Sequence, residues 1–392
     1  MILDIADITL DETVTSDVLG VEPEPTDAAI IIDRPFDPGK IKVTTEQKGI
    51  DLIVRRIDHG EVDLAPEFQR RARVWHPHRK SKLIESLLLR IPLPVFYVAA
   101  NAKDDWAVVD GLQRLTTIYD FMKNSFKLSG VEYLSVLEGK TFGDLDRPMQ
   151  RRIEETELVV NVIQPGTPEE VMINIFKRIN TGGVPLTGQE IRNALNKGPA
   201  REYLRGMAAS EAFMSATDGG VRDDRMDAQE MVLRYLAFTL VRPEDYRVND
   251  LDAFLNDTMQ RLNAMSSYER EKLENEFGRA MAAARAIFDN AAFRKPKVQS
   301  NNALSPGRNP VSKPLFEAWS VNLSMLTDDQ LKTLGERKQL VRDELLTLIR
   351  SDPDFVISIS YSTGVPARVL KRFSEIKALV NRVLDVEVDV DD

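Results

Sequence analysis

The chain has 392 residues, more than one hydrophobic core usually serves, so two domains are expected. It contains no cysteine and only three histidines, all in its first quarter, which excludes disulfides, thiolate catalysis, cysteine-based zinc sites and a histidine-dependent nuclease centre farther along. The net charge of −10 arises at the ends, with nine acidic residues in residues 1–33 and five in residues 385–392, so the slightly basic body permits contact with nucleic acid without requiring it.

Apolar runs in the chain are short. The best one, Ile91 to Ala100, contains two prolines and does not approach the length of a membrane span. The first residues are acidic, unlike those of a secretory signal. We therefore expect a cytoplasmic protein with no membrane partner.

Composition and periodicity predict four parts. An acidic N-terminal arm covers residues 1–43, and an α+β domain covers residues 44–197. A mostly α-helical domain follows over residues 198–384, and an acidic tail covers residues 385–392.

The α+β domain is expected to begin with a helix. Thr44 and Thr45 can cap a helix that ends at His59-Gly60, and a short strand follows over residues 61–64. Further along, a helix is predicted over residues 78–90 and a strand over residues 95–100.

The segment from Phe68 to Lys82 contains six Lys or Arg residues and no acidic residue, with Phe68 and Trp75 interleaved. Such a composition suits an anionic backbone or a nucleotide. The alternative is that the aromatic residues anchor the core and the charges form a solvated rim, which we prefer for most of them. Arg70 differs because it lies in a short turn bounded by proline, where its side chain can be aimed at a ligand.

The most informative stretch is Trp106-Ala-Val-Val-Asp-Gly-Leu-Gln-Arg-Leu-Thr-Thr117. Its pattern predicts a strand, a tight turn at Asp110-Gly111 and a helix that buries Leu112, Leu115, Ile118, Tyr119 and Met122. A glycine turn and a helix start bring unpaired N–H groups and a positive dipole end toward a ligand, and Arg114 adds a charge suited to phosphate oxygens. An ordinary Asp-Gly turn with a solvated arginine is the alternative.

The rest of this domain is predicted to contain a helix over residues 112–124, a strand near residues 126–128, a helix over residues 148–155 and a strand over residues 158–163. We expect the strands to pair through hairpins more than through long crossovers.

A second polar cluster follows at residues 178–193. A helix over residues 168–179 is predicted to end at Asn180-Thr-Gly-Gly183, and the next helix begins at Thr187 with Glu190 at capping-box spacing. The residues Arg178, Asn180, Arg192 and Asn193 would close the phosphate site if they fold over Gly111. Ordinary helix capping and surface pairing is the alternative.

From about Gly198 the pattern is helical, with helices predicted over residues 199–209, 227–240, 249–265, 267–288, 311–325, 327–350 and 365–384. A basic loop over residues 293–313, rich in Pro, Asn and Ser, interrupts this pattern and is predicted to be mobile. Five Lys or Arg residues between Arg294 and Lys313 could contact DNA phosphates, or could belong to a plain surface loop.

Several pieces together resemble one family. They are Pro66-Glu-Phe-Gln-Arg70, Leu83-Ile-Glu-Ser-Leu-Leu88, Ile91-Pro-Leu-Pro-Val95, Val108-Val-Asp-Gly-Leu-Gln-Arg-Leu-Thr-Thr117, Ile175-Phe-Lys-Arg-Ile-Asn-Thr-Gly-Gly183 and Glu190-Ile-Arg-Asn-Ala194. In this order and spacing they are similar to the N-terminal domain of GmrSD-type and SspE-type restriction proteins of bacterial phage defence, over roughly residues 45–200. That domain is related to the ParB/sulfiredoxin fold, so the resemblance implies an α+β domain of this type with a small mixed sheet.

The resemblance implies a site for a nucleoside triphosphate, GTP or another, and for Mg²⁺. Gly111 and the helix start would hold the phosphates, Arg114 would neutralise them, and Gln69 and Arg70 would reach them from the facing turn. Asp110 would hold Mg²⁺ or orient water, and Gln113 would position the attacking water, so that Asp110, Gln113 and Arg114 form the catalytic set.

Two departures from the family pattern leave alternatives open. Leu112 stands where the motif often has glutamine, so the chain is expected either to hydrolyse the nucleotide or only to bind it. The histidine count leaves no place for the His-Asn-His nuclease domain of the two-domain relatives, so a partner nuclease or another defence protein is implied.

The first hypothesis is therefore a regulatory NTP-binding component of a defence system that acts with DNA or a nuclease, and an oligomer is compatible with it. The second is a non-enzymatic ParB-like DNA-binding protein, and the third is a DNA nuclease.

Overall fold

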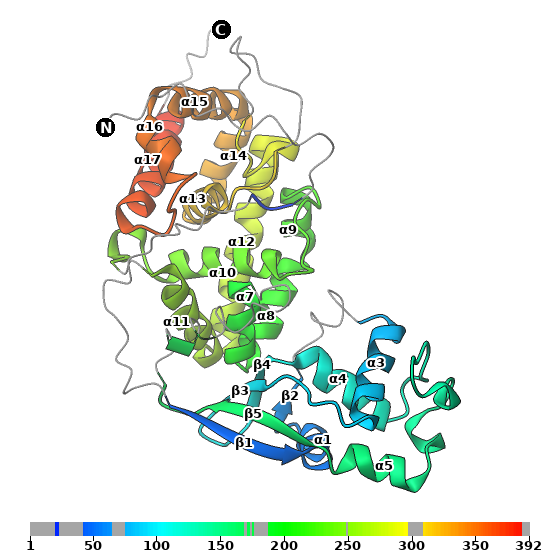
Figure 1. Ribbon diagram of the computed structural model, residues 1–392. Helices are drawn as coiled ribbons and strands as arrows, with labels where there is room; N and C mark the ends of the chain where they lie inside the picture. The colour runs from blue at the N-terminus through cyan, green and yellow to red at the C-terminus, as the bar shows by residue number, and fades with distance from the viewer. Residues whose placement is uncertain are drawn as a thin grey trace, which may run out of the picture. The chain divides into compact units, whose positions relative to one another are not determined.

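The computed structural model describes residues 20–22, 42–64, 75–167, 171–172, 175, 187–247, 250–296 and 309–385. The chain divides into two compact units (Figure 1). The first, here called the sheet unit, comprises Ile31–Gly198 and the three residues Asp224–Met226. The second, the helical unit, comprises Met1–Ile30, Pro199–Asp223 and Asp227–Asp392. No helix among the described segments combines the length and the apolar character needed to cross a membrane.

The sheet unit is built on a small mixed sheet of five described strands, in the order β1-β5-β3-β4-β2. Their bounds are β1 (Val43–Gly49), β2 (Val62–Asp63), β3 (Phe96–Ala100), β4 (Trp106–Asp110) and β5 (Glu157–Ile163). The β1–β5 and β3–β4 pairs are antiparallel, whereas β3–β5 and β2–β4 are parallel. The α+β class with a small mixed sheet is confirmed.

Helices cover both faces of this sheet. On one face, α1 (Ile50–Asp58), α3 (Pro77–Leu88), α4 (Leu112–Met122) and α5 (Arg147–Glu154) bury apolar side chains against Phe96, Val98, Trp106, Val108 and the alternate residues of β5. On the other face, α7 (Gly188–Leu195) packs Ile191 against Ala99, Val109 and Ile163. Alternation along the strands thus sends successive side chains into two separate cores.

Three predictions for this unit were wrong. Thr44 and Thr45 lie in β1 rather than at a helix cap, because residues 43–49 pair with β5 and α1 begins only at Ile50. Residues 126–128 form no strand, since the backbone of Leu128 instead exchanges hydrogen bonds with Gly139 and Lys140 in a loop. Only β3 and β4 form a hairpin, and the other strand pairs join distant segments of the chain. This unit also contains the 3₁₀ turns η3 (Ser135–Leu137) and η4 (Phe142–Asp144).

The helical unit contains α8 (Pro199–Ala208), α9 (Glu211–Ala216), α10 (Asp227–Leu240), α11 (Leu251–Ala264), α12 (Ser267–Phe288), α13 (Lys313–Ser324), α14 (Asp328–Glu336), α15 (Lys338–Ser351), α16 (Pro353–Ser358) and α17 (Pro366–Asp385), with the 3₁₀ turns η6 (Pro243–Asp245) and η7 (Asp289–Ala291). The helical character predicted for this part of the chain is confirmed. The single helix predicted over residues 327–350 is in fact two, separated at Arg337. The short α9 and α16 were not predicted, because a helix of six residues shows too few repeats of the helical period.

Inside the helical unit, an ion network joins three helices. Glu317 of α13 is fully buried and binds Arg234 of α10 at 2.8 Å and Arg372 of α17. Glu230 of α10 also accepts from Arg234, and Lys313 of α13 lies 3.0 Å from it. Buried charges of both signs compensate one another here, as buried ions must.

Candidate functional site

The predicted strand, turn and helix around Asp110 are confirmed as β4, Gly111 and α4. The register between β3 and β4 shifts beside the turn, where Tyr97 pairs with Asp110 but Val98 pairs with Val108. Val109 is therefore an extra residue on β4, and such a bulge re-aims the residues that follow it. Leu112, Leu115 and Ile118 of α4 are buried as expected, and Tyr119 and Met122 pack against the same core.

Gly111 has backbone angles that favour glycine, with φ 96° and ψ 6°. A Cβ atom at this position would also lie 2.9 Å from Cε1 of the Phe96 ring, nearer still to Cδ1, and 3.1 Å from Nη2 of Arg114. The fold itself therefore requires glycine here, whatever ligand the turn meets.

Helix α4 begins without a capping side chain and with no acidic residue in its first turn. Among the described hydrogen bonds, none uses the backbone N–H of Leu112 or Gln113. Unpaired first-turn N–H groups and the positive end of the helix dipole favour an anion. The start of α4 is therefore compatible with an anion.

Arg114 is held by protein groups. Its guanidinium donates to the backbone oxygen of Pro94, to that of Val95 at 3.2 Å and to the Asp110 carboxylate at 2.9 Å, and it lies 4.2 Å from the centre of the Phe96 ring. Its side chain is only 12% exposed. Burial lowers the pKa of Arg114 and Asp110 opposes that effect, but an arginine remains charged in either case. The arginine thus braces the turn against β3 and places a positive charge behind the start of α4.

Asp110 and Gln113 are both half-buried. Arg114 binds Oδ2 of Asp110, and no described hydrogen bond uses Oδ1. The side chain of Gln113 likewise has no described hydrogen bond, and its backbone oxygen accepts from Thr117 at 2.7 Å. These two side chains retain polar atoms for a ligand.

The predicted capping box at α7 is confirmed. Thr187 Oγ1 accepts from the Glu190 N–H at 3.1 Å, and Glu190 Oε2 accepts from the Thr187 N–H at 2.7 Å. Glu190 is 3% exposed and also accepts two hydrogen bonds from Arg225, at 2.9 and 2.7 Å. Arg225 lies in the three-residue segment that returns to the sheet unit, and sequence patterns gave no sign of this partner.

Arg192 and Asn193, predicted to contact the ligand, are both buried on α7, which packs against β4. This burial contradicts the alternative interpretation of these two residues, in which they would pair with other side chains at the surface. The other predicted ligand contacts, Gln69, Arg70, Arg178 and Asn180, lie outside the described residues.

The described basic residues are mostly bound to other protein groups. Lys80 lies 3.0 Å from Asp120, Lys82 pairs with Glu132, and Arg79 stacks on Trp75, which packs at the edge of the core. Segment 294–313 has three described basic residues, and each of them contacts polar groups of the helical unit itself. Arg294 donates to the backbone oxygen of Thr217 at 2.9 Å, and Lys295 lies 2.7 Å from Glu22. Lys313 lies 3.0 Å from Glu230.

Both ends of the loop predicted over residues 293–313 are packed. Phe293 and Val311 are buried, and Arg294 and Val21 each form a β-bridge with Val311. The N-terminal arm is therefore docked at Val21 within the helical unit.

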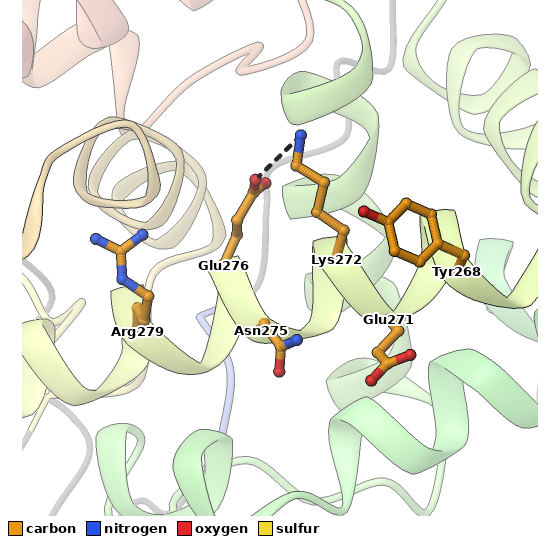
Figure 2. Close-up of a pocket in the computed structure, with 6 residues that line it drawn as sticks. All are labelled: Tyr268, Glu271, Lys272, Asn275, Glu276 and Arg279. Atoms are coloured by element: carbon orange, nitrogen blue, oxygen red, sulfur yellow. Dashed lines mark ion pairs between the residues drawn. The ribbon is translucent and has the colours of Figure 1, made fainter.

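Figure 2 shows a pocket on the helical unit, with all its labelled residues on α12: Tyr268, Glu271, Lys272, Asn275, Glu276 and Arg279. Lys272 and Glu276 form a loose ion pair at 3.9 Å, and Arg279 is held by Asp328 at 2.7 Å. Tyr268 is exposed. Mixed charges on one exposed helix face describe a solvated surface better than a ligand site.

Comparison with known families decides the identity of the sheet unit. Residues 51–196 match the family described as GmrSD restriction endonuclease, N-terminal domain. This segment is a GmrSD-type N-terminal domain. It includes α1 through α7 and therefore the whole described part of the candidate site. No curated protein matches the sequence.

Proposed function

We propose that the GmrSD-type domain binds a nucleoside triphosphate with Mg²⁺, and that the chain is a regulatory component of a bacterial restriction or phage-defence system. The family match supports the restriction and defence context. The observation that carries the nucleotide proposal is the uncapped start of α4 behind the left-handed Gly111.

The phosphates would lie against the free N–H groups of Leu112 and Gln113, with the charge of Arg114 behind them. Mg²⁺ is commonly bound by one or two carboxylates together with substrate phosphates rather than by a cage of protein ligands. Asp110 could supply such a carboxylate ligand, because Arg114 binds only one of its two carboxylate oxygens among the described contacts. Bound there, the cation would neutralise phosphate charge.

Hydrolysis is proposed to depend on Gln113, whose side-chain amide has no described protein partner and can orient a water. Leu112, which replaces the glutamine common in the family motif, is 7% exposed and packs in the core beneath α4. The replacement therefore changes a packing position and removes no polar group from the free side of the helix.

The test is equilibrium binding of ATP, GTP, CTP and UTP with Mg²⁺ by calorimetry, followed by phosphate release, on the wild-type chain and on Gln113→Ala. We expect wild type to bind at least one triphosphate, and Gln113→Ala to keep binding but to release phosphate about 100-fold more slowly, the typical effect of losing one positioning group. A matched control is Gln47→Ala, at an exposed position of β1. Absence of binding by wild type at millimolar nucleotide would refute the proposal.

The partner is proposed to be DNA or a nuclease, as the family suggests. Nucleotide binding would then regulate that partner. A pull-down with DNA or with a candidate nuclease, and a cleavage assay with that nuclease, each with and without nucleotide, measure this regulation directly.

A further inference from the structure

Helix α3 ends in a turn that holds an arginine where glycine is usual. Arg90 follows the C-cap Leu89 with a φ of 59°, in the left-handed conformation that favours glycine. Its N–H donates to the backbone oxygen of Leu87 at 3.0 Å, and the N–H of Ile91 donates to that of Ser86 at 2.9 Å. Helices that end with this pair of hydrogen bonds usually carry glycine at the position of Arg90. Arginine destabilises the turn relative to glycine, so its side chain calls for a use outside the turn.

The Arg90 side chain has no partner within the described part of the protein. It is exposed, and it forms no hydrogen bond or ion pair with any described residue. Two other exposed arginines of the sheet unit differ, since Arg55 pairs with Asp51 and Arg147 pairs with Glu154. The guanidinium of Arg90 therefore keeps all its donors for another molecule.

A second arginine lies at the same place. Arg152 of α5 donates from Nη1 to the backbone oxygen of Leu88 at 2.8 Å, which puts its guanidinium at the last turn of α3. Arg151 precedes it on α5, and both arginines are exposed. Neither forms an ion pair with a described residue, and this includes Glu155 at the C-cap of their own helix. Positive charge thus gathers at the end of α3, and no described carboxylate binds it.

Two apolar side chains flank Arg90 and are also exposed. Leu89 is 38% exposed and Ile91 is 50% exposed. In this type of helix end the residue at the position of Ile91 commonly packs on the side chain three residues before the C-cap, but here that residue is Ser86 and offers no apolar contact. Neighbouring apolar side chains exposed among charges are a feature of binding sites. We call Leu89, Arg90, Ile91 and Arg152 the α3-end surface.

We infer that the α3-end surface binds duplex DNA, an inference that rests on the part of the proposed function that names DNA as a partner. The guanidinium groups of Arg90 and Arg152 bind backbone phosphates, because their planar forks match phosphate oxygens. Leu89 and Ile91 lie against the sugars of the minor groove, where DNA-binding proteins place apolar side chains beside arginine.

The chemistry of the surface favours DNA over other partners. A free nucleotide offers one anionic group, whereas a DNA strand alternates phosphates with apolar sugar faces, as the α3-end surface alternates arginines with Leu89 and Ile91. A protein partner is ordinarily held by charges of both signs, but the unpaired charge here has one sign only.

The experiment measures the binding of a short fluorescent duplex by anisotropy over a series of salt concentrations. Arg90→Gly and Arg152→Gln should each weaken binding about ten-fold and reduce the slope of log affinity against log salt by about one. Ile91→Ser should also weaken binding about ten-fold but leave the slope unchanged, because it removes an apolar contact and no charge.

Lys103→Gln is the matched control. Lys103 is an exposed cation in the turn after β3, at the opposite end of that strand from residues 91–95, and it has no described ion pair. This variant changes the net charge as much as Arg90→Gly does, so any general effect of charge is equal in both. It should leave both the affinity for DNA and the salt slope unchanged.

The melting temperature separates a lost contact from a damaged fold. Arg90→Gly should raise it by about 2 °C, because glycine adopts the left-handed conformation without the cost that arginine bears. A variant that is more stable than wild type and yet binds DNA more weakly has lost a binding group, since its fold is intact.

Three other outcomes would count against the inference. Unchanged affinity and slope in both arginine variants would overturn it and leave DNA as a partner through another surface. Loss of triphosphate affinity, or of binding to a candidate nuclease, with DNA affinity unchanged would assign the surface to that ligand and overturn it as well. If wild type does not bind the duplex at low salt, DNA fails as the proposed partner and this inference fails with it, whereas the proposal of nucleotide binding is unaffected.

Discussion

Replacement of Gly111 by alanine tests how the turn at the candidate site is built. The new residue would have to adopt φ near 96°, and the left-handed conformation costs an L-residue about 1 to 2 kcal/mol. Its Cβ would also lie 2.9 Å from Cε1 of Phe96, and forcing an extra carbon into a packed region costs typically about 1 to 3 kcal/mol. The expected loss in the free energy of unfolding is therefore about 2 to 5 kcal/mol, the sum of these two ranges.

A matched control separates the two contributions. Gly139 also has positive φ, at 77°, but a Cβ there would meet no atom within 4 Å. Gly139→Ala should therefore show only the conformational cost, about 1 to 2 kcal/mol. The difference between the two variants measures the contact with Phe96.

Urea unfolding is the assay, followed by tryptophan fluorescence. Trp106 is buried in the sheet unit and Trp319 in the helical unit, so a Trp319→Phe background makes the signal specific to the sheet unit. In a Phe96→Leu background, Gly111→Ala should reduce the free energy of unfolding by a smaller amount, because the Phe96 ring that the new methyl group would meet is gone. The reasoning is refuted if Gly111→Ala destabilises no more than Gly139→Ala, or if the Phe96→Leu background leaves its cost unchanged.

Two further predictions concern buried carboxylates. Arg225→Ala should reduce the free energy of unfolding of the sheet unit by about 3 kcal/mol, because it leaves the buried carboxylate of Glu190 without its arginine partner. As a control, Arg205→Ala, which removes an exposed ion pair with Glu202, should cost less than about 1 kcal/mol. Equal losses in urea unfolding would contradict this prediction. Burial acts to raise the pKa of Glu85, but hydrogen bonds from the backbone N–H groups of residues 132–134 outweigh burial and lower that pKa. The ionised carboxylate therefore stabilises the fold at pH values above the ordinary glutamate pKa. This stabilisation is lost as the pH falls through the lowered pKa. Glu85→Gln should therefore reduce the free energy of unfolding by about 2 kcal/mol at pH 7, where the carboxylate and its hydrogen bonds are lost. The difference from wild type should shrink as the pH falls below the ordinary glutamate pKa, and parallel curves of unfolding free energy against pH would count against this prediction.

Sequence patterns predicted the elements whose stability is local. The helices of the C-terminal half follow from their apolar spacing, and the capping box at Thr187 and Glu190 follows from side chains only three residues apart. β1 was missed because Val43–Gly49 is largely polar and mostly exposed, and only its pairing with residues 157–163 makes it a strand. Its structure is set by a partner more than a hundred residues away, which no local pattern contains.

In the candidate site, too, local features could be predicted from the sequence and contacts between distant segments could not. The turn and the direction of α4 were predictable from Asp110-Gly111 and the apolar face that follows. The contacts of Arg114 with the Phe96 ring and with the backbone oxygens of Pro94 and Val95 could not be predicted, because they depend on the hairpin between β3 and β4. A polar stripe on α7 could have been read from the helical period, but its burial depends on tertiary packing.

The contacts of the Asp-Gly-Leu-Gln-Arg motif also decide where function should be tested. Gly111, Leu112 and Arg114 are each required by the fold: one for its φ and its contact with Phe96, one for the core, and one to brace the turn. Loss of nucleotide binding in Arg114→Ala would therefore follow from a collapsed turn as readily as from a missing phosphate contact. Gln113 has no described side-chain bond to lose, so a defect in Gln113→Ala with unchanged unfolding free energy would be a defect in the site itself.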